Sequence, residues 1–306
     1  MKKWGCDKCD GLGYRTLPQM ARRQAAYSLE PCECVEALCR ACLGDKTSPW
    51  VYLDEKTGKI RACECKSPRD QLSRVRELFN ASNIPARYRF HRLKEFNLQP
   101  QYPNPTRSPE LEAAKRGAQV ALTAAFDKAL HFIEAQKKLA NGQQGSGVSV
   151  GSIAASDLKG LFLIGPPGTG KSLLAAMILN ELILTAGLSC RYVKISRDFF
   201  QQLRATFNND SGSSTETVFN DIARQDILVI DDFGIQSDSE WEQRMLYDLV
   251  DARYEAELPT IITSNIDLDA VKNLFKGRIY SRLTEMLHIV EFFSVRDYRQ
   301  DMQGLA

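Results

Sequence analysis

The 306-residue chain has 43% apolar and 25% charged residues, which is typical of a soluble globular protein with about two domains. No apolar run approaches the roughly 18 residues that span a membrane, and the first residues lack the apolar core of a secretory signal, so we expect a cytoplasmic protein without a membrane partner. The net charge of +2 hides an asymmetry, because residues 1–94 carry 19 lysines and arginines against 11 acidic residues. This mildly basic region permits contact with nucleic acid or an acidic protein.

Eight of the nine cysteines lie in the first 65 residues as four close pairs. A C-x-x-C pair followed by a C-x-C pair occurs twice, and two such pairs supply the four thiolates of a tetrahedral zinc site. Zinc is favoured over disulfides, which a reducing cytoplasm disfavours, and over iron–sulfur clusters, whose typical four-cysteine run is missing. The spacing does not decide whether each repeat binds its own ion or the pairs interleave. The expected ligands are Cys6, Cys9, Cys32, Cys34, Cys39, Cys42, Cys63 and Cys65.

The middle of the chain is mostly helical in pattern. Residues 66–83 have the periodicity of a basic amphipathic helix. Residues 83–90 interleave arginines with aromatics, which could stack bases and pair phosphates but is more typical of a domain junction. A proline-rich loop follows at 100–109, then a long helix at 110–139 and a Gly/Ser-rich connector at 141–156. We therefore expect a cysteine-rich zinc-binding domain at 1–66, a helical linker or insertion at 67–157 and a nucleotide-binding α/β domain at 158–306.

Residues 165–172 match the phosphate-loop pattern G-x-x-x-x-G-K-[ST] at every specified position. The glycines let successive N–H groups point inward, and the helix that follows adds its positive end. Lys171 can reach the β- and γ-phosphates, and the Ser172 hydroxyl can bind Mg²⁺. The context agrees, because an apolar strand at 161–164 precedes the loop and a helix follows it up to Gly187. The expected phosphate-binding residues are Gly165, Pro166, Pro167, Gly168, Thr169, Gly170, Lys171, Ser172 and Leu173.

From residue 158 onward, strand and helix patterns alternate, which predicts a parallel sheet. A strand at 189–195 leads to a helix near 197–207 and an exposed loop at 208–217. The strand at 227–230 ends in two aspartates. Asp231 fits the role of holding Mg²⁺ and Asp232 that of orienting or deprotonating the attacking water, although either could be a solvated loop residue. An aspartate where a glutamate is usual suggests slow hydrolysis.

Two later stretches complete the expected site. The strand at 260–264 leads to Asn265, which would lie beside the γ-phosphate and share the lytic water. Arg278 and Arg282 stand four residues apart, so both can project from one helical face. A guanidinium there stabilises the charge of phosphoryl transfer, while the alternative is a surface arginine paired with an acid.

The motifs together resemble those of an AAA+ ATPase and, more narrowly, of bacterial helicase loaders of the DnaC/DnaI type and their IstB-like relatives. The resemblance covers about residue 84 to the end, apart from 100–157, and its motifs are specific in combination. It implies that Arg282 is an arginine finger and Arg299 the sensor-2 arginine. The absence of an Asn-Lys pair, and hence of the guanine-reading motif, favours ATP over GTP. The matching stretches are 84–88, 161–175, 228–234, 251–254, 259–265, 278–285 and 297–299.

The resemblance implies an oligomeric, ATP-switched loader that places a DnaB-type replicative helicase on single-stranded DNA. The amino-terminal part would grip the helicase, and the ATPase module would contact DNA and neighbouring copies. Its cofactors would be ATP, Mg²⁺ and Zn²⁺. Two alternatives stay open: a transposition helper ATPase acting with a transposase on double-stranded DNA, and a zinc-based adaptor whose nucleotide site hydrolyses little.

Overall fold

The computed structural model describes residues 6–21, 24–39, 42, 49–100, 108–143, 158–208, 214–234, 239–273 and 277–297. The chain forms two compact units. One comprises Met1–Ala81 with Ile183–Gly187, and the other comprises Ser82–Leu182 and Leu188–Ala306. The domain limits expected from the sequence stay a prediction. None of the helices in the described ranges has the length and apolar character that crossing a membrane requires.

The larger unit is built on a five-stranded parallel sheet with the strand order β6-β7-β8-β5-β9. The three inner strands are largely apolar runs that are buried on both faces, as a parallel sheet between helices requires. Because β5 lies beside β8 and β8 beside β7, their carboxyl ends meet at one edge. The strands are β5 (Gly160–Ile164), β6 (Cys190–Lys194), β7 (Ile227–Phe233), β8 (Thr260–Ser264) and β9 (Leu287–Glu291).

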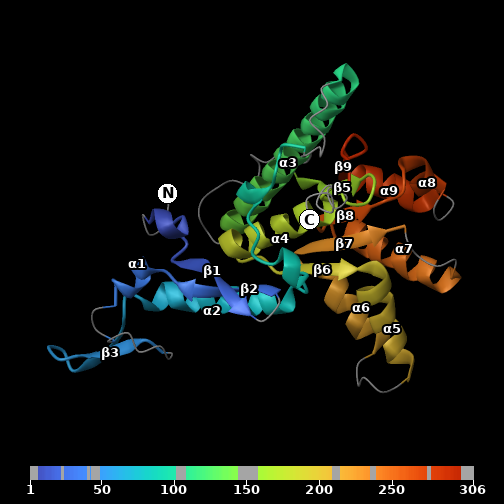
Figure 1. The fold of residues 1–306 in the computed structure, drawn as a ribbon. Helices are drawn as coiled ribbons and strands as arrows, with labels where there is room; N and C mark the ends of the chain where they lie inside the picture. Colours follow the sequence, from blue (N-terminus) through green and yellow to red (C-terminus); the bar gives the residue numbers. More distant parts are fainter. Residues whose placement is uncertain are drawn as a thin grey trace. The chain divides into compact units, whose positions relative to one another are not determined.

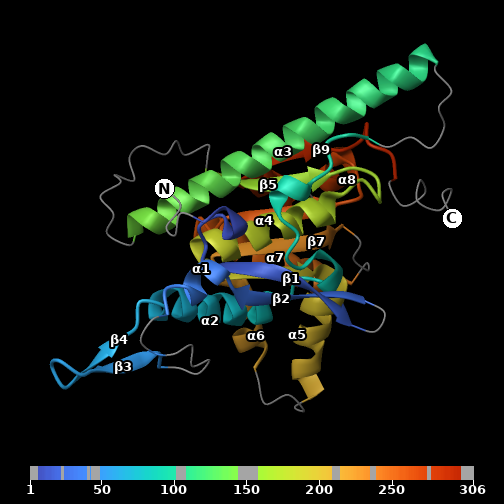
Figure 2. The same cartoon turned by 60° about the vertical axis from the view of Figure 1, so that its left-hand side comes forward.

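Helices cover both faces of this sheet (Figure 1). The long helix α3 runs past β9 and β5, and Figure 2 shows it extending beyond the sheet. One apolar core joins the sheet to α7 and α9, with Phe162, Leu249 and Leu283 fully buried in it. The helices are α3 (Pro109–Gln143), α4 (Lys171–Ala186), a π-helical turn (Ile195–Phe200), α5 (Gln201–Ala205), α6 (Thr215–Ala223), α7 (Glu240–Glu255), α8 (Leu268–Asn273) and α9 (Arg278–Met286).

The elements of this unit confirm the alternation expected from the sequence, with three differences in extent. Strand β7 continues through both aspartates because it stays paired with β8 as far as Phe233. Helix α3 begins at Pro109, which the first turn of a helix accepts because its missing N–H is not needed there. Helix α6 begins within the expected loop, since the Ser214 side chain caps it by accepting from the Thr217 N–H at 3.1 Å. Most of the expected proline-rich loop and connector lies outside the described residues.

In its described residues the smaller unit contains two hairpins, one helical turn and one longer helix. They are the hairpin β1 (Tyr14–Ala21)–β2 (Gln24–Pro31), a single turn α1 (Glu33–Glu36), the hairpin β3 (Val51–Asp54)–β4 (Lys59–Ala62) and α2 (Lys66–Ala81). The sequence analysis predicted α2 and none of the strands. Helix α2 is fixed by Arg76, whose Nε donates to the Leu29 carbonyl at 3.1 Å, and by Arg69, whose guanidinium lies 6.0 Å from the Trp50 ring centre.

Candidate nucleotide site and cysteine clusters

The phosphate loop connects β5 to α4 at the carboxyl edge of the sheet. Gly168 and Gly170 have φ of 78° and 95°, a left-handed backbone that favours glycine. Gly168 is also required by close approach, because a Cβ there would lie 1.6 Å from Oδ1 of Asp297. Lys171 is 5% exposed, and its Nζ donates to the carbonyl oxygens of Gly165 at 2.7 Å and Pro166 at 2.6 Å. The loop is therefore curled around the ammonium group of its own lysine.

The two aspartates lie next to this loop in different environments. The Asp231 side chain is 1% exposed, and its Oδ1 accepts from Ser172 Oγ and from Thr263 Oγ1, each at 2.7 Å. The strand register shifts between Ile230 and Phe233, and Asp232 takes a φ of 63° there. Its side chain is 39% exposed as a result. The two residues expected to hold Mg²⁺, Ser172 and Asp231, thus touch each other, while Asp232 faces the space beside them.

A lysine that sequence reasoning missed lies between the two acids. Lys194 ends β6, and its Nζ is 3.5 Å from Asp231 Oδ2 and 3.4 Å from Asp232 Oδ2. Tyr192, two residues earlier in the same strand, is also near Asp231. Burial, and then the negative charge of Asp231, raise the pKa of Tyr192 far above its ordinary value, so it stays a neutral hydroxyl.

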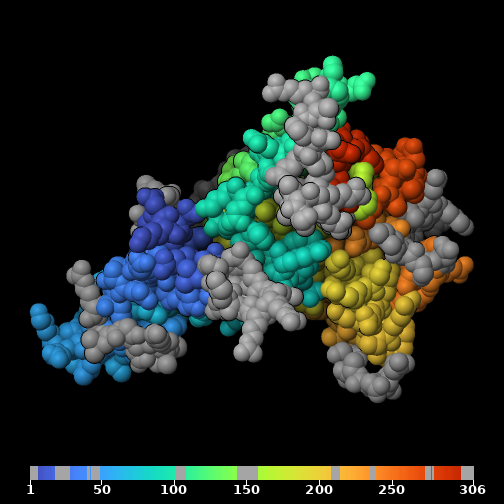
Figure 3. All heavy atoms as spheres, in the orientation of Figure 1, coloured from blue at the N-terminus to red at the C-terminus, as the bar shows by residue number. Residues whose placement is uncertain are grey.

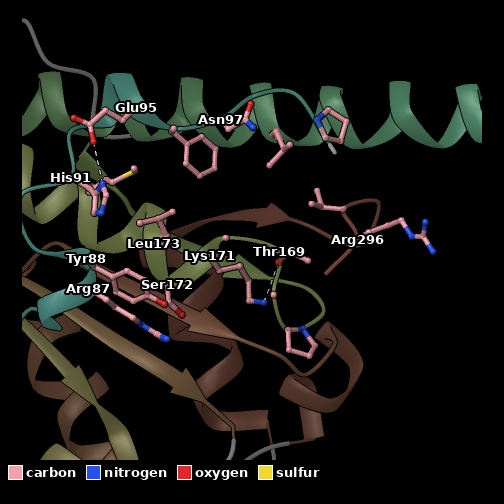
Figure 4. A pocket seen from close by; sticks show the side chains of 18 of the residues that line it. Arg87, Tyr88, His91, Glu95, Asn97, Thr169, Lys171, Ser172, Leu173 and Arg296 are labelled. Carbon is pink, nitrogen blue, oxygen red and sulfur yellow. Dashed lines mark hydrogen bonds and ion pairs between the residues drawn. The ribbon is translucent and has the colours of Figure 1, made fainter. Parts of the chain in front are cut away.

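A cavity of 740 Å³ opens beside the phosphate loop (Figure 4). The expected residues Pro167 to Leu173, Asp232 and Asn265 line it, together with Lys194. Its other side comes from the segment before α3, including Tyr88, His91 and Phe96. These apolar and aromatic groups face the loop across a space of the size that a drug-sized ligand occupies. In the sequence, the 84–88 motif was the only indication that this segment matters for function. Its spacing alone does not predict that the segment lines the cavity.

The segment from residue 83 to residue 97 is anchored to the ATPase unit by buried polar contacts. Asn180 of α4 donates to the carbonyls of Tyr88 at 2.7 Å and His91 at 3.0 Å. Arg92 pairs with Glu181 through two hydrogen bonds of 2.8 Å. In Figure 3 the segment, in teal, lies across the surface beside the yellow α5–α6 region. The segment thus forms one wall of the cavity and also connects α2 to α3 along the chain.

The expected arginine finger is held by its own chain. Arg282 Nε lies 2.5 Å from Asp251 Oδ1, although the two atoms are not aligned as a hydrogen bond. Its guanidinium carbon is 5.0 Å from the ring centre of Tyr247 and 5.6 Å from that of Tyr254. It is not among the residues that line the described cavity. The sensor-2 candidate, Arg299, lies outside the described residues, so both roles stay predictions.

Arg253, another residue of the family-like motifs, is a buried structural group. It is fully buried, and its guanidinium donates to Thr260 Oγ1 at 2.8 Å and to the carbonyls of Ala223 at 2.8 Å and Gln225 at 2.7 Å. Burial lowers the pKa of Arg253 to about 9, which leaves it charged at neutral pH. It ties α7 to β8 and to the turn before β7.

The eight paired cysteines form two separate clusters, one for each sequence repeat. Within each cluster the Sγ atoms lie within 4.8 Å of one another, and none of the nine cysteines, all within the described residues, forms a disulfide. The distances of 3.9 Å for Cys6–Cys32 and 3.7 Å for Cys9–Cys34 are close to the roughly 3.8 Å edge of a tetrahedron with 2.3 Å zinc–sulfur bonds. The clusters are Cys6, Cys9, Cys32 and Cys34, and Cys39, Cys42, Cys63 and Cys65.

The donor set of these clusters fits a structural zinc ion. The Gly13 N–H donates to Cys9 Sγ at 3.3 Å, which stabilises a thiolate in a tight knuckle. In the second cluster burial acts to raise the pKa of Cys63, but hydrogen bonds from the Cys65 and Cys42 N–H groups lower it to about 6. Burial raises the pKa of Cys65 in the same cluster and of Cys32 in the first. A thiolate is the form that binds a metal, so Cys63 is the member of its cluster best prepared to bind one. The structure also answers the pairing question, because neighbouring pairs combine and do not interleave.

The sheet order, the phosphate loop after β5 and the acid pair in β7 define an AAA+ P-loop ATPase module, preceded by a cysteine-rich unit that could bind zinc. This confirms the expected fold class. Residues 149–300 match the model of the IstB-like ATP binding protein family.

Similar proteins include the replicative helicase loader DnaC of Escherichia coli strain K12, which is 34% identical over 140 residues that cover 46% of this chain and 56% of DnaC. An uncharacterized protein of the same strain, YdaV, is 36% identical over 120 residues, covering 39% of this chain and 47% of YdaV. The chain therefore spans about half the length of these curated relatives. The crystal structure of the DnaC helicase loader matches with a TM-score of 0.44 at 19% identity, covering 65% of this chain and 97% of that one.

Proposed function

We propose that this protein is an ATP-switched loader that delivers a DnaB-type replicative helicase onto single-stranded DNA. The observation that carries the proposal is the 34% identity to the helicase loader DnaC over 140 residues. The cysteine-rich unit, outside the matched IstB-like domain, is the part that would grip the helicase. The ATPase module would contact DNA and further copies of the chain.

The cavity supports ATP as the ligand. The phosphates would lie in the nest of the loop, where Lys171 turns from the Gly165 and Pro166 carbonyls to the phosphate oxygens. The base would enter the side lined by Tyr88 and Phe96, whose flat faces suit an aromatic ring. Anchoring by Asn180 keeps this wall in place, so that nucleotide binding requires little ordering of the segment.

The residues around Ser172 and Asp231 fit a magnesium ion. They offer a hydroxyl and a buried carboxylate, both oxygen ligands, at a hydrogen-bonded distance of 2.7 Å. Bound there, the ion would neutralise charge on the phosphates. Asp232 and Asn265 both line the cavity. Asp232 would orient or deprotonate water, and Asn265 would hold the same water.

Arg282 is proposed to act across an interface between copies. In the single chain Asp251 and two tyrosines hold it, so it must exchange Asp251 for the neighbour's phosphate when copies assemble. Hydrolysis by an isolated chain is then slow. DNA that aligns copies would increase the rate.

The test of the proposal is helicase loading with purified components. The protein with ATP should transfer a DnaB-type helicase onto single-stranded DNA that is coated to block spontaneous loading. The variant Lys171→Ala should not bind ATP, and Asp232→Asn should bind it without turnover. Binding to a helicase without ATP-dependent transfer would contradict the loader function and favour a zinc-based adaptor.

The name of the matching family favours one second candidate, a transposition helper. That function predicts stimulated ATP hydrolysis on double-stranded DNA and capture of a transposase. A comparison of single-stranded and double-stranded DNA as activators at equal length therefore separates the two functions. Preference for the duplex, with no effect on helicase, would overturn the loader proposal.

A further inference from the structure

One buried arginine of the cysteine-rich unit lacks a carboxylate partner in the described part of the chain. Arg69 lies in the first turn of α2 and is 8% exposed. Among the residues that the structure describes, no acid forms an ion pair with it, and its Nε has no hydrogen-bond partner. The adjacent acid, Asp70, instead lies 3.0 Å from Lys66 Nζ. A buried charge is stable only when opposite charge lies close to it, so Arg69 requires an anion of another kind.

The second cysteine cluster lies beside this guanidinium. Arg69 follows Cys65 by four residues, and its N–H donates to the Cys65 carbonyl at 3.3 Å, so both side chains lie on one face of the helix. Trp50, whose ring centre is 6.0 Å from the guanidinium carbon, packs in one apolar cluster with Cys42, Cys63 and Cys65. Burial raises the pKa of the Cys65 thiol, and a hydrogen bond from the Arg69 side chain acts against that rise. The thiols of this cluster are therefore the groups that can supply the missing anion.

Zinc in such a cluster creates a buried negative charge. Four thiolates carry four negative charges and Zn²⁺ only two positive ones, so the centre keeps a double negative charge. Cys42, Cys63 and Cys65 are 9%, 5% and 0% exposed, so little water is available to solvate that charge. The Arg69 guanidinium supplies one full positive charge, and the positive end of the 16-residue helix α2 adds a partial one directly after Cys65. The cation and the centre thus each satisfy the other's need for opposite charge.

The first cysteine cluster has a different electrostatic environment. The cations near it, Lys8 and Arg15, already share the Glu33 carboxylate at 2.5 Å and 3.1 Å. Their side chains are 64% and 32% exposed, so water screens their charges. Two of the four thiols, those of Cys6 and Cys34, are also partly exposed. The first cluster therefore relies on solvent, whereas the second has a buried cation of its own.

We propose that Arg69 is the counter-ion of a zinc–tetrathiolate centre at the second cysteine cluster and makes this centre hold its metal more tightly than the first. This inference rests on zinc as the ion that the cysteine clusters bind. Arg69 is a positioning residue in this scheme, because it does not touch the metal but stabilises the thiolates that do. The order of metal loss follows from it: the first cluster releases its zinc before the second.

The test measures the loss of zinc from each cluster separately. The full chain is purified with zinc, equilibrated with increasing chelator and alkylated, and mass spectrometry identifies the cysteines that have become reactive. In the parent, cysteines of the first cluster should react at a lower chelator concentration than those of the second. Arg69→Met keeps an unbranched side chain against Trp50 but removes the charge. It should make the second cluster react at about 10–100-fold lower chelator concentration and leave the first unchanged.

Two further variants separate charge from packing. Arg69→Lys keeps a positive charge on a different shape and should retain most of the parent's resistance to chelator. Arg74→Met removes the same charge from an exposed position of the same helix and should match the parent. An Arg69→Lys variant that loses zinc as readily as Arg69→Met would overturn the counter-ion role, because packing and not charge would then explain the effect.

The remaining outcomes separate this inference from zinc binding itself. If elemental analysis finds no zinc in the parent, the metal assignment is wrong. If the parent holds two ions and Arg69→Met behaves as Arg74→Met does, or if both clusters of the parent release zinc at the same chelator concentration, the proposal for Arg69 is wrong. An Arg69→Met protein that purifies with zinc in the first cluster alone, while Arg69→Lys holds two ions, would support the proposal. Loss of the second ion from both variants would overturn it.

Discussion

The nucleotide edge of the sheet and the cysteine-rich unit solve the same problem, the placing of a few polar groups, by different physical means. At the sheet edge, residues as distant in sequence as Ser172 and Asp231 touch because β5, β8 and β7 are neighbours over a large apolar core. In the cysteine-rich unit the ligands come from four local pairs, and the apolar cluster around the second set joins the cysteines to Val35 and Trp50. The larger unit can therefore fold on hydrophobic burial, whereas the smaller one depends on its proposed metal.

Removal of zinc gives the largest expected effect and the most direct test of this contrast. Structural zinc in small domains contributes roughly 10–16 kcal/mol of apparent binding free energy, which is folding free energy. A strong chelator, or Cys63→Ser, should unfold the cysteine-rich unit and leave the affinity for an ATP analogue within about threefold. Hydrogen exchange resolved by peptide measures both the unfolding of the cysteine-rich unit and the binding of the ATP analogue. Protection of residues 49–81 that survives chelation would show that the unit needs no metal.

Arg282→Ala tests whether the nucleotide site of the larger unit is completed by an arginine from a neighbouring copy. An arginine supplied from a neighbour contributes roughly 10³–10⁵ to the rate of phosphoryl transfer, so DNA-stimulated hydrolysis should fall by that order while nucleotide binding persists. Mixing Arg282→Ala with Asp232→Asn should restore part of the activity, since some interfaces then combine an intact base with an intact finger. Asp251→Asn, which removes the partner of Arg282 in the chain, should raise the basal rate. Failure of the mixture despite proven co-assembly would argue against action in trans.

Arg253→Leu tests how much a single polar group in the core contributes to the stability of the larger unit. The substitution leaves the carbonyls of Ala223 and Gln225 buried without their donor, so we expect a loss of about 1–3 kcal/mol for each carbonyl in the free energy of unfolding. Denaturant unfolding of the ATPase unit measures it. The cysteine-rich unit should keep its metal content, and Arg224→Leu, on the neighbouring surface turn, is the control. An equal loss in the control would contradict the role of the buried guanidinium.

The smallest effect is expected where the cysteine-rich unit carries apolar residues that do not form a core. Leu53 and Ile60 are cross-strand partners in the β3–β4 hairpin and are 62% and 73% exposed. Replacing both by threonine, a β-branched residue that suits a strand, should change stability by no more than about 0.5 kcal/mol. The midpoint of zinc-dependent unfolding reports it. A large loss of stability would show that this face of the hairpin is buried in the folded protein. The cysteine-rich unit would then depend on apolar burial as well as on the metal that Cys63→Ser removes.

The sequence predicted those parts of the site that local pattern specifies. A phosphate loop needs Gly168, Gly170 and Lys171 at fixed spacing, and cysteine pairs need fixed spacing for a knuckle, so both are visible without a structure. The site residues that the sequence did not predict are brought to the site by long-range packing. Lys194 becomes part of the site only because β6 pairs with β7, and Tyr88 only because Asn180 binds its carbonyl.

The strands of the cysteine-rich unit were missed for a different reason. Strands β3 and β4 have only four residues each, and their exposed residues Leu53 and Ile60 break the usual relation between apolar character and burial. The partner of Arg282 was also invisible, since Asp251 reaches it through the packing of α7 on α9. Long-range packing, and not residue chemistry, limited what could be predicted.

The left-handed backbone at Asp232 restricts which substitutions can serve as probes of the proposed catalytic role of this residue. Aspartate and asparagine tolerate a φ of 63° better than other residues with a β-carbon, because their short polar side chains can bond locally. Asn at position 232 thus removes the charge and leaves the chain path unchanged, whereas alanine or glutamate adds about 1–2 kcal/mol of strain to whatever chemical change is intended. The same constraint makes replacement by the longer glutamate an unreliable route to a faster ATPase, since a gain in reach would be offset by a displaced strand end.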